Sequence, residues 1–134
     1  QLPARIAKEE AVTPNEYQKL ALRTEKTKPF VSDDLQLSRL MHAAMGLATE
    51  SGELIDELKR HTIYGEALDP VAVMAEAGDL LWYLVLALDA VGYTLEEAME
   101  RNVAKLELRH SRDRDLGRDL EGERTLLEGT GTKS

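Results

Sequence analysis

Apolar residues recur with helical spacing in four successive segments of the chain, and capping residues or prolines open most of these segments. The four predicted helices cover approximately residues 13–23, 32–61, 70–92 and 94–110. Capping-box sequences open the first helix at Thr13 and the fourth at Thr94, while Asp69 followed by Pro70 opens the third. No segment shows the alternation or the β-branched enrichment of a strand. The pattern therefore predicts an all-α fold with a four-helix, bundle-like core.

The same pattern divides the chain into three parts. Residues 1–12 are weakly patterned and are expected to form an N-terminal arm, whereas residues 13–110 form one helical domain. With 134 residues the chain is long enough for one domain with a core of its own. After Ser111 charges and glycines dominate, so we expect residues 111–134 to be a polar tail. This tail is either solvated or packed on a partner subunit.

Two pairs of carboxylates interrupt the apolar helices. The residues within each pair are three positions apart and so share a helix face, and the pairs are Glu50 with Glu53 and Glu76 with Asp79. The second pair lies in a segment so apolar that we expect its helix to be central to the core. A buried ionised carboxylate costs several kcal/mol unless it shifts its pKa, pairs with a base or binds a metal. Because residues 61–100 contain no Lys or Arg, the partner must be a cation or one of Lys59, Arg60, Arg101, Lys105 and Arg109.

Antiparallel packing of the second and third helices would bring the four carboxylates together. Oxygen ligands without cysteine or paired histidine select hard cations such as Mg²⁺ or Mn²⁺. On the fourth helix, Asn102, Lys105 and Arg109 recur at spacings of three and four, so one face offers groups suited to phosphate oxygens. Acids on two helices and bases on a third outline a phosphoryl-transfer site.

The aromatic residues beside the second acidic pair allow two interpretations. Trp82 and Tyr83 are most simply core residues. Tyr83, however, lies four residues after Asp79 on the same helix face, close enough to stack on a nucleobase.

Composition excludes several classes of function. A net charge of −8 argues against binding to a nucleic-acid backbone. The absence of cysteine is compatible with a reducing cytosol and no signal peptide is visible, so we expect a cytoplasmic protein. The segment 70–91 is long enough to span a membrane, but each of its three acids would cost roughly 2.5 to 3.5 kcal/mol near the bilayer centre. We therefore interpret it as a core helix with no membrane contact.

These motifs resemble the MazG-like all-α nucleoside triphosphate pyrophosphohydrolases. The family pattern of ExxE followed by ExxD stands here as Glu50 to Glu53 and Glu76 to Asp79, and the segment from Asn102 to Arg109 is similar to the family's NxxKLxxR. The opening sequence NEYQKLALRT also resembles the N-terminal helix of small stand-alone members, so the likeness runs from about residue 15 to residue 110. One departure is that His110 and Ser111 stand where many members carry an RYP-like ending.

The resemblance implies Mg²⁺-dependent cleavage of an NTP or dNTP between the α and β phosphates by a homodimer or homotetramer with shared sites. It assigns the metal to Glu50, Glu53, Glu76 and Asp79, and the phosphates to Lys105, Arg109 and Asn102. One glutamate would act as general base, and we favour Glu50 or Glu53 over Asp79.

Two other functions compete with this interpretation. In a non-enzymatic helical dimerisation module, the acids would merely pair with Lys59, Arg60 and Arg101. A ferritin-like di-metal bundle normally needs ExxH on two helices, and only Glu107 to His110 fits that pattern. His42, His61 and His110 are expected to be structural or exposed rather than ligands.

Overall fold

The computed structural model describes residues 11–26, 33–112 and 120–129. Within these ranges the chain forms five α-helices and one short 3-10 helix, with no strand, so the predicted all-α class is confirmed. The elements are α1 (Pro14–Ala21), η1 (Leu22–Thr24), α2 (Leu35–Thr62), α3 (Pro70–Ala90), α4 (Leu95–Arg112) and α5 (Leu120–Glu128). Most of the predicted N-terminal arm, and Pro29 between the first two predicted helices, lie outside the described residues.

The helices begin at the predicted capping residues. Thr13 and Glu16 form a reciprocal capping box before α1, and Thr94 with Glu97 forms the equivalent box before α4. The carboxylate of Asp69 accepts the first free backbone N–H groups of α3. Beyond the end of α3, Gly92 adopts φ +81°, a left-handed conformation that side chains disfavour. These local rules fix where the helices start and where α3 stops.

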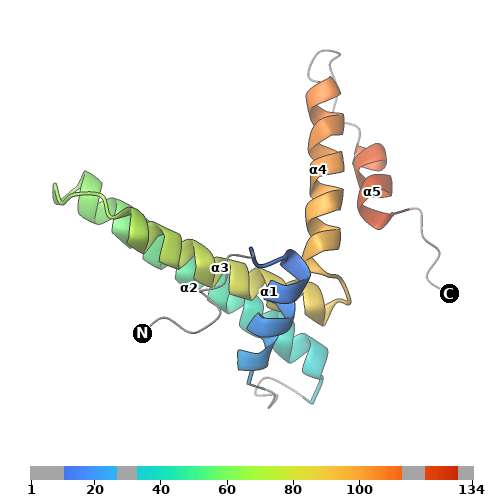
Figure 1. The fold of residues 1–134 in the computed structure, drawn as a ribbon, viewed down its shortest axis with the longest axis horizontal. Helices are drawn as coiled ribbons and strands as arrows, with labels where there is room; N and C mark the ends of the chain where they lie inside the picture. The colour runs from blue at the N-terminus through green and yellow to red at the C-terminus, as the bar shows by residue number, and fades with distance from the viewer. Residues whose placement is uncertain (1–10, 27–32, 113–119, 130–134) are drawn as a thin grey trace.

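A long antiparallel arm of α2 and α3 dominates the molecule (Figure 1). Helix α1 lies across this arm and contacts both α3 and α4. Helix α4 leaves the arm at a steep angle, and α5 packs back along it.

A polar junction holds α1, α2 and α3 together near the C-terminal end of α3. Arg39 of α2 donates two hydrogen bonds to the carboxylate of Glu25, at 2.7 and 2.9 Å, and a third to Asp89 at 2.7 Å. The buried Gln18 of α1 donates to Asp89 at 3.3 Å and accepts from the backbone N–H of Leu95 at 2.7 Å. We call Gln18, Glu25, Arg39 and Asp89 the α1 junction. Both carboxylates contact the Arg39 guanidinium, so the junction orders the helices without leaving an ion that lacks a partner.

Helix α3 is less buried in the single chain than its sequence led us to expect. Among the described residues of α3 only Val85, Leu86 and Ala90 are buried. Its length and composition alone would allow it to cross a membrane, and only 11% of its apolar window is buried inside the chain. An arm of two helices covers one face of each and leaves the other uncovered within the single chain, which explains the difference.

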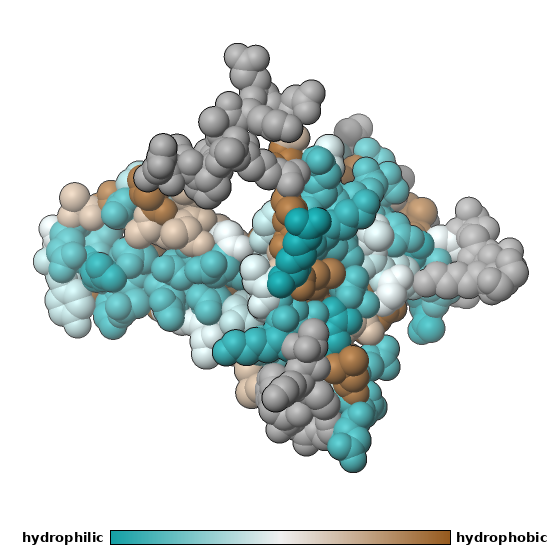
Figure 2. Space-filling view, turned by 60° about the horizontal axis from the view of Figure 1, so that its bottom comes forward, coloured by the Kyte–Doolittle hydropathy of each residue, from teal (hydrophilic) through white to brown (hydrophobic). Residues whose placement is uncertain are grey.

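Large apolar side chains therefore remain exposed along the arm. Those of α2 include Leu37, Met41, Met45 and Ile55, and those of α3 include Val71, Met74 and Leu84. Figure 2 shows apolar side chains at the surface in several places on this side of the molecule, including on the arm. Such a surface is typical of an interaction face.

The expected polar tail contains a helix that the sequence did not reveal. Helix α5 packs on α4, and the guanidinium of Arg101 donates to the backbone carbonyl of Leu127. Nine residues with few apolar side chains give no convincing stripe, so this helix depends on its contact with α4.

Candidate functional site

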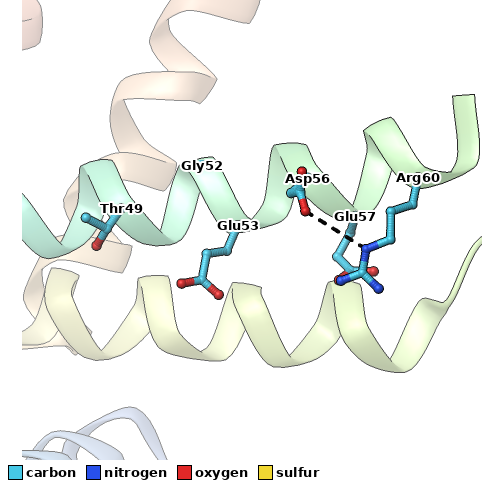
Figure 3. Close-up of a pocket in the computed structure, with 6 residues that line it drawn as sticks. All are labelled: Thr49, Gly52, Glu53, Asp56, Glu57 and Arg60. Atoms are coloured by element: carbon cyan, nitrogen blue, oxygen red, sulfur yellow. Dashed lines mark hydrogen bonds and ion pairs between the residues drawn. The ribbon is translucent and has the colours of Figure 1, made fainter. Parts of the chain in front are cut away.

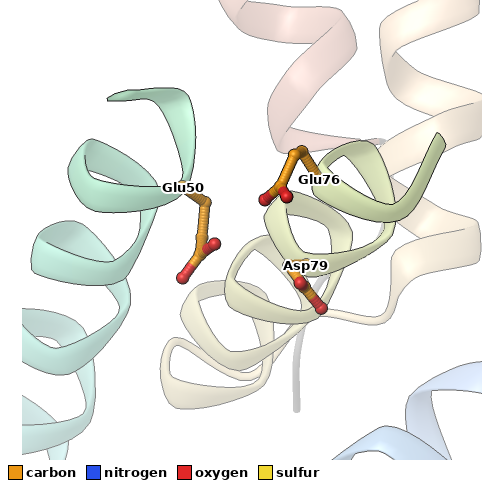
Figure 4. Close-up of side chains that lie close together, drawn as sticks. All are labelled: Glu50, Glu76 and Asp79. Carbon is orange, nitrogen blue, oxygen red and sulfur yellow. The ribbon is translucent and has the colours of Figure 1, made fainter. Parts of the chain in front are cut away.

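Three of the four predicted metal ligands converge on one point of the arm. Glu50 of α2 and Glu76 and Asp79 of α3 each place a carboxylate oxygen within 4.8 Å of the others. Figure 4 shows Glu50 and Glu76 projecting from facing helices, with Asp79 one turn further along α3. We call these three residues the carboxylate cluster. The antiparallel packing predicted from the short loop produces it.

Glu53 lies beside the cluster rather than within it. It lines a neighbouring cavity of about 440 Å³ together with other α2 residues, which are Thr49, Gly52, Asp56, Glu57 and Arg60 (Figure 3). Its negative charge nevertheless contributes to raising the pKa of both Glu50 and Glu76. The fourth predicted ligand is therefore close enough to act on the cluster electrostatically.

The cluster carries negative charge that no neighbouring base offsets within the described residues. Partial burial raises the pKa of Glu50, and the charges of Glu53 and Asp79 raise it further. The pKa of Glu76 is raised in the same way, first by partial burial and then by Glu53, Asp79, Glu50 and Glu57. Every contribution disfavours ionisation, so a bound cation would relieve the whole group.

The bases expected as alternative partners of the motif acids pair with other acids. Lys59 forms an ion pair with Asp56, and Arg60 donates to Glu57 at 2.7 Å. On α4, Arg101 lies 4.0 Å from Glu97 and its guanidinium stacks over the ring of Tyr93, 5.0 Å from the centroid. These three bases are the partners that the non-enzymatic interpretation assigned to the motif acids.

An aromatic cavity of about 310 Å³ adjoins the cluster and is lined by Glu50, Asp79, Trp82 and Tyr83. The ring of Tyr83 meets the ring of Trp82 edge-on, with centroids 4.9 Å apart. Trp82 also donates from Nε1 to the backbone carbonyl of Ala21, at 3.0 Å, and so anchors the end of α1. Tyr83 thus both packs against other side chains and lines the cavity. Trp82 was expected only to pack, but it lines the cavity as well.

Tyr17 of α1 is a neighbour of the site that sequence reasoning missed. Partial burial raises the pKa of its hydroxyl, and the negative charge of Asp79 raises it further. The sequence placed Tyr17 on a helix, but nothing in it showed that α1 crosses the arm near Asp79.

The predicted phosphate-binding residues lie on α4. Lys105 and Arg109 are half-buried and Asn102 is exposed. Among the α4 residues whose side chains the structure describes, none lines either of the two cavities above. Within one chain, then, the structure gathers the acids at these cavities but not the bases of α4.

The histidines stand apart from the carboxylate cluster. His42 contacts the rings of Trp82 and Tyr83, and the Nδ1 atom of His61 lies 2.8 Å from the carbonyl oxygen of Glu66. No histidine belongs to the three-ligand group found among the described residues, and neither does Glu107. An oxygen-only donor set of this kind suits a hard divalent cation.

Comparison with known proteins identifies one family. The family model described as the MazG nucleotide pyrophosphohydrolase domain matches residues 40–112, more than half of the chain. This range contains the carboxylate cluster, Glu53, the aromatic cavity and the basic face of α4, which is formed by Lys105 and Arg109. Neither a curated protein nor a solved structure matched the chain.

Proposed function

Because the chain belongs to the MazG nucleotide pyrophosphohydrolase domain family, we propose that it hydrolyses a nucleoside or deoxynucleoside triphosphate between the α and β phosphates. The products are the nucleoside monophosphate and pyrophosphate. The observation that carries the proposal is the carboxylate cluster, in which three acids from two helices meet and no base of the described part of the chain offsets them.

The cluster is suited to Mg²⁺, with Mn²⁺ as a substitute. Glu50, Glu76 and Asp79 would hold the cation, and Glu53 would complete the set from the adjacent turn of α2. When bound, the cation supplies a lowered pKa for the attacking water and offsets charge on the triphosphate.

Within this site Glu50 or Glu53 serves as general base. Glu50 is the better supported of the two, because it lines the cavity in which the nucleotide would lie. The ring of Tyr83 offers a stacking surface for the nucleobase in the same cavity.

A homodimer or homotetramer completes the site in this proposal. The exposed apolar side chains of α2 and α3 favour a second copy of the chain, since burying them in an interface stabilises the arm by about 25 cal/mol per Å² of apolar surface. The second copy would also bring Lys105, Arg109 and Asn102 of its α4 to the phosphates. Their absence from the lining of the two cavities supports this arrangement.

The competing functions have less support. A dimerisation module would use Lys59, Arg60 and Arg101 to neutralise the motif acids, but these bases contact Asp56, Glu57 and Glu97. A ferritin-like centre would need a second ExxH motif.

Incubation with a panel of NTPs and dNTPs tests the proposal. We expect equal amounts of monophosphate and pyrophosphate in the presence of Mg²⁺ or Mn²⁺, and no turnover with EDTA. Reaction in ¹⁸O-labelled water should place the label in the monophosphate if water attacks the α phosphorus. Release of orthophosphate, or turnover without metal, would contradict the proposal.

A further inference from the structure

Gly46 lies in the middle of α2 and is buried against α3. Glycine inside a helix is less favourable than alanine, so a buried helical glycine calls for a packing reason. A Cβ atom placed on Gly46 would lie 2.1 Å from Cε1 of Tyr83 and 2.3 Å from Cδ1 and Cζ. By contrast, a Cβ atom on Gly52 of the same helix would meet nothing within 4 Å. The ring of Tyr83 therefore lies directly on the backbone of α2, in space that only glycine leaves free.

This contact is next to the proposed site. Gly46 precedes Glu50 by one helical turn, and Tyr83 follows Asp79 by one turn, so the ring sits beside two of the acids that line the aromatic cavity. The rings of Trp82 and His42 contact Tyr83 edge-on, with centroids 4.9 and 5.5 Å away. Because Tyr83 also lines the aromatic cavity, that cavity offers open space into which the ring can be displaced.

We propose that Gly46 is a positioning residue, which keeps the ring of Tyr83 against α2 and so keeps the aromatic cavity open for the nucleobase. The inference rests on the proposed function for the identity of the ligand. The effect of Gly46 on the shape of the cavity can be measured independently of turnover.

Acrylamide quenching of Trp82 provides that measurement, because Trp82 lines the cavity and is the single tryptophan of the chain. Gly46→Ala should push the Tyr83 ring over the cavity and reduce the quenching of Trp82. In a Tyr83→Ala background the same substitution should leave quenching unchanged, since no ring remains to be displaced. This double-mutant cycle separates the ring contact from general effects of alanine on the helix.

Kinetics supply a second reading. Gly46→Ala should raise KM for the nucleotide about tenfold or more, the order of one lost base–aromatic stack, while Mn²⁺ affinity stays close to that of the wild type. Gly46→Ala/Tyr83→Ala should match Tyr83→Ala in both KM and Mn²⁺ affinity.

Several results would overturn the inference. These are unchanged quenching in Gly46→Ala, an equal change in both backgrounds, and failure of Gly46→Ala to fold, which would show that the ring cannot move into the cavity. A different outcome is also informative: quenching of Trp82 falls in Gly46→Ala, but the wild-type protein releases no pyrophosphate from any nucleotide. This would support the role of Gly46 and refute the proposed reaction.

Discussion

Asp79 and Asp89 lie on the same helix, ten residues apart, but their carboxylates have opposite surroundings. Asp89 accepts hydrogen bonds from Arg39 and Gln18 within the α1 junction. Asp79 lies with Glu50 and Glu76, and its charge raises the pKa of both. Lys59 and Arg60, which the sequence offered as partners for these acids, are paired with other acids of α2. The difference distinguishes an acid that orders the fold from acids left available for a cation.

The largest expected effect comes from removing charge at the site. Glu53→Gln and Asp79→Asn should each abolish metal-dependent pyrophosphate release. Removing a residue that only hydrogen-bonds to a metal ligand typically lowers activity by up to roughly 100-fold, and we expect a larger loss here because a ligand itself is changed. The fold should stay intact or gain stability, because one repulsive charge is gone. Rates and circular dichroism measured together check both halves of the prediction. Substantial turnover in both variants would remove these residues from the metal site.

Breaking the α1 junction should have the opposite result. Arg39→Met leaves Glu25 and Asp89 without their base, and we expect the free energy of unfolding to fall by about 3 kcal/mol. This value is at the low end for a buried ion pair, because these side chains retain some exposure. The kcat of the remaining folded protein should change little. Urea unfolding measures the loss, and Arg39→Met combined with Glu25→Gln and Asp89→Asn should recover much of it. An unchanged unfolding midpoint in the single variant would show that the junction contributes little.

The basic face of α4 should affect the substrate and not the metal. Lys105→Ala and Arg109→Ala should each lower kcat/KM by roughly 10- to 100-fold, as expected for loss of one charged hydrogen bond to phosphate, while Mn²⁺ binding is preserved. Calorimetry with a non-hydrolysable triphosphate analogue checks the binding step. If both variants bind the analogue and turn over normally, α4 has no part in phosphate handling.

The smallest expected effect is a pH dependence of stability. The pKa of Glu50 lies above its ordinary value of 4.5, so the metal-free folded state binds this proton more tightly than the unfolded state does. Ionisation of Glu50 therefore lowers stability as pH rises through the raised pKa, and protonation restores it as pH falls. Glu50→Gln should be more stable than the wild type at pH 7, and the gap should shrink towards acid pH. A gap that is the same at every pH would contradict the electrostatic account of the cluster.

Much of this comparison was accessible from the sequence, because it depends on local rules. Capping residues placed the starts of α1, α3 and α4, and i, i+3 spacing with a short loop predicted that Glu50, Glu76 and Asp79 would meet. Contacts between distant segments were not accessible. Nothing in the pattern paired Arg39 with Asp89, and the burial expected of α3 assumed a core that one chain does not supply.

Binding of Mn²⁺ without nucleotide, followed by electron paramagnetic resonance in wild type, Asp79→Asn and Asp89→Asn, tests the central claim most directly. The two variants make the same chemical change on one helix, and circular dichroism establishes that both are folded. We predict that Asp89→Asn binds Mn²⁺ like the wild type, whereas Asp79→Asn binds at least about tenfold more weakly. Equal affinity in all three proteins, or equal loss in both variants, would contradict the assignment of the carboxylate cluster as the metal site.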